Sequence, residues 1–140
     1  MKEWGQAYEV PETISCYTLD NIPHFEEKCF AAFRNQGVKL CLTGFSGGVR
    51  YTSVVRYTKA HVWVAKEYVA DFLSLTGCKE IDSGANVSVY IADSDEVFVD
   101  SRYIDQSRIA SPVQIFLDCM QLKGRGEEMA EAVFSKEIHK

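Results

Sequence analysis

Long apolar runs are missing from this chain of 140 residues, and no stretch approaches the roughly 18 apolar residues of a membrane-spanning helix. The opening residues, MKEWGQAYEVPE, are polar and acidic and contain no apolar signal-peptide core. Positive charge is also scarce: the chain has 15 Lys and Arg and 20 Asp and Glu, which gives a formal net charge of −5. Strong binding to nucleic acid needs clustered Lys and Arg. We therefore expect a cytoplasmic protein with no membrane association and little nucleic-acid binding of its own.

The five cysteines are odd in number, are widely spaced and contain no CxxC pair, which argues against a disulfide framework and against a zinc site. Three of them, Cys29, Cys41 and Cys119, lie within apolar patterns, where cysteine behaves as a small hydrophobic residue. We expect buried structural thiols, with no metal and no cofactor.

The overall composition is that of an ordinary globular chain, with 46% hydrophobic and 25% charged residues. A chain of this length is expected to form one domain with one core. We divide it into an N-terminal arm, residues 1–23, and a single α/β domain, residues 24–140.

The stretch from 38 to 65 organises the rest of the chain. An apolar run at 38–42 predicts a buried strand, the residues Thr43 to Gly48 predict a tight turn, and a short helical segment through Tyr51 leads to a second strand at 60–65. Before this unit, Asn21-Ile22-Pro23 predicts the start of a helix at 24–35, which Gly37 would end.

After this unit, hydrophobic periodicity predicts a second helix and several strands. Ser111-Pro112 predicts the start of a further helix, with Val113, Phe116, Leu117 and Met120 on its apolar face. The fold class is therefore α/β (α+β): a small mixed sheet with flanking helices, ending in a helix pair. The expected elements are a helix at 67–76, paired strands at 78–82 and 86–92, strands at 97–99 and 103–109, and a final helix at 127–138.

The Gly-rich turn, with Gly44, Ser46, Gly47 and Gly48, leaves two interpretations open. A strand, a Gly-rich turn and a second strand follow one another in nucleotidyltransferases, where the second strand carries two metal-binding carboxylates. Here the corresponding positions are Ala60 and Val62, which cannot bind magnesium. The segment is then either a degenerate nucleotidyltransferase-like scaffold or only the packing centre of a small domain.

The middle of the chain is mildly basic, since residues 38–79 contain six basic residues, Arg56 among them, and only two acids. A solvated face and a phosphate site explain this balance equally well. An enzyme would need carboxylates from elsewhere, such as Asp93, Asp95 or Asp100, although a solvated turn is the simpler account of that acidic cluster. His61 would alternate with its neighbours and point away from the main core as a surface or hydrogen-bonded histidine.

The segment Gly124-Arg125-Gly126-Glu127 joins the last two helices. Its glycines free the backbone on both sides of Arg125, so the guanidinium can form a bidentate pair with a carboxylate. We interpret the segment as a structural latch, with partner binding as the alternative.

The same region carries a family resemblance. The residues SPVQIFLD from Ser111, followed by GRGEEMAEA from Gly124, are similar to the closing pattern of bacterial AbiEi-type antitoxins, the transcriptional regulators of type IV toxin–antitoxin systems. The blocks LTGFS from Leu42 and SGANV from Ser83 also resemble that family, in the same order. The resemblance spans about residues 24–138.

The resemblance implies a non-enzymatic regulator that counteracts a nucleotidyltransferase toxin encoded next door, without a stable complex between the two. Members of the family carry a winged-helix DNA-binding region before the antitoxin domain, whereas about 23 residues precede the first expected helix here. We therefore expect promoter DNA to be bound only through a region absent from this chain, with a homodimer as a possible assembly. The positions expected to matter for partner binding or for the fold are Gly44, Ser46, Gly47, Gly48, Arg56, Gly124, Arg125, Gly126 and Glu127.

Overall fold

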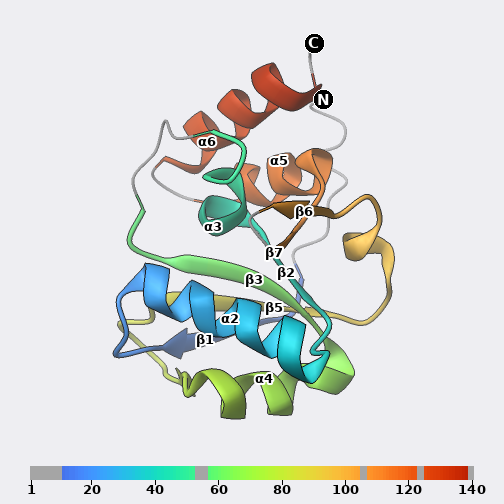
Figure 1. Ribbon diagram of the computed structural model, residues 1–140. Coiled ribbons are helices and arrows are strands. Elements are labelled where there is room, and N and C mark those ends of the chain that lie inside the picture. The colour runs from blue at the N-terminus through green and yellow to red at the C-terminus, as the bar shows by residue number, and fades with distance from the viewer. Residues whose placement is uncertain (1–10, 53–56, 105–106, 123–124, 139–140) are drawn as a thin grey trace.

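The computed structural model describes residues 11–52, 57–104, 107–122 and 125–138. Strands and helices alternate in the first half of the chain, and several strands then precede the closing helices, as Figure 1 shows. The strands are β1 (Thr13–Tyr17), β2 (Leu40–Leu42), β3 (Ala60–Ala65), β4 (Lys79–Glu80), β5 (Val87–Ala92), β6 (Arg102–Ile104) and β7 (Ser107–Ile109). The α-helices are α2 (Ile22–Gln36), α3 (Gly44–Gly48), α4 (Val69–Thr76), α5 (Pro112–Met120) and α6 (Gly126–Val133), and a π-helical turn (Phe134–Ile138) follows α6.

The strands form a mixed sheet of the order β4-β1-β5-β3-β2-β7-β6. At its centre β3 runs parallel to β5 and antiparallel to β2. Helices α2 and α4 lie together on one face of the sheet, and α3, α5 and α6 lie together on the other (Figure 1). All six residues of β3 are buried because both faces are covered. The mixed sheet with flanking helices and a closing helix pair confirms the expected fold class.

The helix ends follow from their capping residues. The Asn21 side chain accepts a hydrogen bond from the His24 amide at the start of α2, and Gly37 ends the helix with a left-handed φ of 69°. The Ser111 side chain accepts one from the Gln114 amide at the start of α5. These starts and stops are confirmed, because capping depends on residues that are adjacent in sequence.

Other expectations about the strands are wrong. Segments 78–82 and 86–92 do not pair with each other, because β1 lies between β4 and β5 and is antiparallel to both. Residues 97–99 do not form a strand, since a 3-10 turn occupies Glu96–Phe98. The expected strand at 103–109 is an antiparallel pair, β6 and β7. Long-range pairing decides each of these points, and local pattern does not encode it.

The apolar face of α5 also differs from the expected one. Ile115 and Cys119 are fully buried, as is most of Phe116, whereas Val113 and Met120 are 36% and 40% exposed. The buried face of α5 is therefore rotated, relative to the expected one, toward the polar Asp118, which is only 3% exposed. Among the described residues, no helix is long and apolar enough to cross a membrane.

Candidate functional site

The Gly-rich segment forms helix α3 and is buried between the sheet and the last two helices. Gly44, Ser46, Gly47 and Gly48 are all buried. A Cβ atom at Gly47 would lie 2.8 Å from the Leu42 carbonyl oxygen, and one at Gly48 would lie 2.6 Å from the Met129 Sδ. Such separations are too short for real Cβ atoms. The expected tight turn is a short helix, and its glycines allow close packing of α3 on its neighbours, as the packing-centre interpretation requires.

The start of α3 is closed by two further contacts. Gly44 has a φ of +55°, and a Cβ there would lie 2.8 Å from the His61 ring. The Ser46 Oγ accepts a hydrogen bond from the His61 amide at 3.1 Å and is fully buried. A phosphate or an acyl substrate therefore has no access to Ser46 or to the backbone around it.

The buried carboxylate of Asp118 holds α5 to this segment. Its Oδ2 accepts hydrogen bonds from the Thr43 hydroxyl at 2.5 Å and from the Trp63 indole at 2.7 Å, and its Oδ1 accepts one from Gln114 at 3.0 Å. Thr43 is the N-cap residue of α3. A negative charge beside this N-cap would repel a nucleotide phosphate, so the polar groups here stabilise the fold and do not form a phosphate cradle.

A second buried carboxylate, that of Glu26 on α2, lies beside the end of α3. Glu26 is 1% exposed and accepts hydrogen bonds from the Arg50 guanidinium at 2.9 Å and from the Tyr57 hydroxyl at 2.8 Å. Burial, together with the charge of Glu26, raises the pKa of Tyr57 well above its usual value. The two carboxylates therefore hold the residues that precede and follow α3, Asp118 from α5 and Glu26 from α2, and the sequence patterns predicted neither of them.

His61 is buried, although the sequence predicted a surface or hydrogen-bonded histidine that points away from the main core. Its side chain points into the core, 2% exposed, with its ring 5.4 Å from that of Phe45 and 6.1 Å from that of Tyr90. Burial, with a smaller contribution from the charge of Lys59, lowers the pKa of His61 from 6.5 to about 4. The Nδ1 atom is buried without a hydrogen-bond partner among the described residues. The histidine is buried because α3 covers the face of β3 that alternation alone would leave open.

The Arg125 segment has a buried glycine and an exposed ion pair. The Arg125 guanidinium donates two hydrogen bonds to the Glu128 carboxylate, at 2.9 and 3.0 Å, which is the expected bidentate geometry. The pair lies within one helix end and is half exposed, so it does not latch two elements together. A Cβ at Gly126 would lie 2.5 Å from the Cys119 carbonyl oxygen, so this glycine is needed where α6 starts against α5.

Three remaining sets of candidate residues do not assemble into a site. Glu127 is exposed, and Arg56 and Gly124 lie outside the described residues. Asp93, Asp95 and Asp100 are exposed, and Asp95 forms an ion pair with Lys39. Within the described ranges, no three His, Cys, Asp or Glu side chains are grouped as metal ligands. These acids therefore do not replace the carboxylates that are missing from β3.

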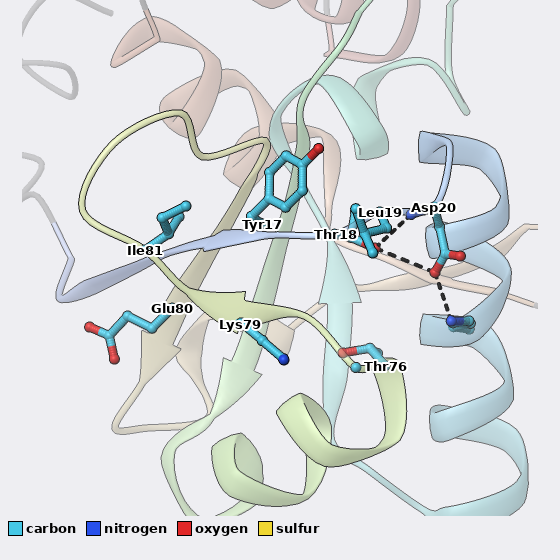
Figure 2. A pocket seen from close by; sticks show the side chains of 10 residues that line it. Tyr17, Thr18, Leu19, Asp20, Thr76, Lys79, Glu80 and Ile81 are labelled. Atoms are coloured by element: carbon cyan, nitrogen blue, oxygen red, sulfur yellow. Dashed lines mark hydrogen bonds and ion pairs between the residues drawn. The ribbon is translucent and has the colours of Figure 1, made fainter.

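The sequence analysis missed a groove at the edge of the sheet where β1 pairs with β4. It has a volume of about 550 Å³ and lies between the end of β1 and the segment that joins α4 to β4. Figure 2 shows Tyr17 and Ile81 on one side of it and Thr76 near the end of α4, with Asp20 bonded to Thr18 and Lys28. Three large apolar side chains at the groove are exposed, namely Tyr17 (40%), Leu19 (92%) and Ile81 (38%). Only the pairing of β1 with β4 could have revealed it.

Comparison with known proteins gives the family. A family model described as a transcriptional regulator, the AbiEi antitoxin of type IV toxin–antitoxin systems, matches residues 1–139. No curated protein and no solved structure matches the chain. The match covers nearly the whole chain and includes both the Gly-rich segment and the α5–α6 pair. The chain therefore belongs to the AbiEi antitoxin family of type IV toxin–antitoxin regulators.

Proposed function

We propose that this chain is a non-enzymatic antitoxin that counteracts a nucleotidyltransferase toxin encoded by a neighbouring gene. The observation that carries the proposal is the burial of Gly44, Ser46, Gly47 and Gly48 beneath α5 and α6, in a chain of the AbiEi antitoxin family. In an enzyme of nucleotidyltransferase type this segment would have to be open to a nucleotide. Here its surroundings are side chains of the same domain and a buried carboxylate.

We expect the exposed start of α6 to contact the partner. Arg125 and Glu128 form a bidentate pair there, and Glu127 is exposed beside them. A guanidinium held in one orientation by a carboxylate can recognise a partner without first losing side-chain freedom. We propose that promoter DNA is bound by a region outside this chain, because a net charge of −5 opposes the approach of DNA.

The test is rescue of growth. The adjacent open reading frame is expressed from an inducible promoter, together with the wild-type chain, an Arg125→Ala variant or an Arg34→Ala variant. Arg34 is a matched control, since it is an exposed arginine on α2, far from α6 in sequence. We expect the wild-type chain and Arg34→Ala to restore growth and Arg125→Ala to restore less.

Two controls make the outcome decisive. The thermal midpoints of all three chains are compared first, and we expect no measurable change for Arg125→Ala because its ion pair is exposed. A toxic neighbour that a folded wild-type chain fails to counteract would contradict the antitoxin proposal. Stabilisation of the chain by magnesium with a nucleoside triphosphate, lost on replacing Asp93 or Asp95, would support the enzyme instead.

A further inference from the structure

Two thiols that play no part in the proposed function, those of Cys16 and Cys78, are sequence neighbours of residues that line the groove of Figure 2. Cys16 lies in β1, and Cys78 follows the C-cap Gly77 of α4. In the antiparallel pair of β1 with β4, Cys16 is opposite Glu80. Cys78 lies two residues before Glu80 in the chain. Side chains two residues apart share a face of the sheet. The two thiols accordingly face the same side and are joined by a side-chain hydrogen bond.

The surroundings make the two sulfurs chemically unequal. The Thr76 Oγ1 lies 3.3 Å from the Cys78 Sγ. Hydrogen bonds to Cys16 and, less strongly, to Thr76 hold the pKa of Cys78 below its usual value despite burial. The hydrogen bond to Cys78 and burial raise the pKa of Cys16. One thiol is therefore easier to ionise, and the other stands next to it as a resolving partner.

Of the remaining cysteines, Cys29 has a strongly raised pKa, and Cys41 and Cys119 lie on the opposite face of the sheet. The Cys29 thiol of α2 is close enough for its pKa to be raised by Cys78, but complete burial is the larger cause and keeps it protonated. Cys41 is opposite Trp63, which bonds to Asp118 of α5, so Cys41 and Cys119 belong to the side of α5.

We propose that Cys16 and Cys78 are a redox-modification site, at which a hydroperoxide converts the two thiols reversibly to a disulfide. The Cys78 thiolate attacks an oxygen of hydrogen peroxide, so an S–O bond forms, the O–O bond breaks and hydroxide leaves to be protonated to water. The Cys16 sulfur then attacks the sulfenic acid, so the S–S bond forms and the S–O bond breaks. The hydroxide that leaves takes the Cys16 proton and becomes the second water. A small dithiol reverses the process by reducing the disulfide and becoming oxidised itself.

The groove lies next to the pair and is the part of the surface that oxidation would change. Tyr17, which follows Cys16, and Gly77 and Lys79, on either side of Cys78, line it. Cys16 is fully buried and Cys78 is 4% exposed, so a small peroxide reaches them more readily than a large oxidant does. The disulfide would tie β1 to the segment between α4 and β4 and so fix the two walls of the groove relative to each other.

The experiment uses the full chain in its folded state. The protein is treated with hydrogen peroxide, remaining thiols are alkylated, and intact mass and peptide mapping identify the product. We expect a loss of two hydrogen atoms, with three of the five cysteines still available to alkylation after denaturation. The disulfide peptide should join Cys16 to Cys78, and a dithiol should restore all five thiols.

Variants assign the roles of the two sulfurs. Cys16→Ser should leave a sulfenic acid at Cys78, trapped by a dimedone reagent, and Cys78→Ser should react many times more slowly. Cys119→Ser is the matched control, a buried cysteine on the side of α5, and should form the disulfide as the wild-type chain does. Wild-type mapping does not depend on whether a variant folds. A product that joins other cysteines, or no disulfide while the folded protein is otherwise oxidised at methionine, would overturn the proposal.

Discussion

Replacing Gly48 by alanine tests whether the Gly-rich segment is a packing element. Its new methyl group would lie 2.6 Å from the Met129 Sδ and 2.7 Å from the Met129 Cγ, and Met129 is fully buried. Overpacking of this kind costs about 1–3 kcal/mol. Alanine is favoured over glycine within a helix by roughly 0.5–1 kcal/mol, which offsets part of that cost. We therefore expect Gly48→Ala to lower the free energy of unfolding by roughly 1–2 kcal/mol.

A double-mutant cycle with Met129→Ala makes the reasoning quantitative. Met129→Ala alone should cost about 2–5 kcal/mol, because it leaves a cavity at a buried position. In the double variant the Gly48→Ala methyl group enters the space that the Met129 side chain has left. The alanine then stabilises the helix without a clash, so the two changes should couple favourably by roughly 2 kcal/mol.

The assay is urea unfolding of the four chains, followed by far-ultraviolet circular dichroism at one pH and one salt concentration. The comparison rests on free energies of unfolding, with equal denaturant slopes as the check on two-state behaviour. Additive effects, or a Gly48→Ala chain more stable than the wild type, would refute the packing account. An exposed phosphate-binding loop predicts one of those two results, since its glycine would face open space.

Two further changes probe the buried polar groups. Burial lowers the pKa of His61 from 6.5 to about 4, so protonation favours the unfolded chain in this range. The free energy of unfolding should therefore be at its full value above pH 6.5 and fall by about 3 kcal/mol as the pH drops to 4. Urea unfolding across this range should give a flatter pH profile for His61→Phe, and an unchanged slope would contradict the assignment. Asp118→Asn should cost about 1–3 kcal/mol because two donors face one carboxylate oxygen. The exposed Asp93→Asn should change the unfolding free energy by under about 0.5 kcal/mol, and equal effects would disprove the buried role.

The sequence alone predicted much of the local structure, because local structure depends on neighbours along the chain. The Asn21 and Ser111 caps, the Gly37 stop and the limits of β3 needed only residue type and spacing. The bidentate pair of Arg125 also follows from local spacing, since its carboxylate partner lies three residues away. The family resemblance rested on residues of α5 and α6 in the same way, and the family match confirms it.

Only the tertiary structure decided what surrounds these elements. The pattern of 60–65 predicted a strand, but whether His61 faced water or α3 depended on a helix that closes over it. Apart from Gln114, the donors to the buried carboxylates of Glu26 and Asp118 come from segments 24 to 75 residues away. The sequence likewise places Cys16 and Cys78 far apart, and the insertion of β1 between β4 and β5 brings them together. Periodicity measures exposure along one element, whereas burial and bonding depend on which elements meet.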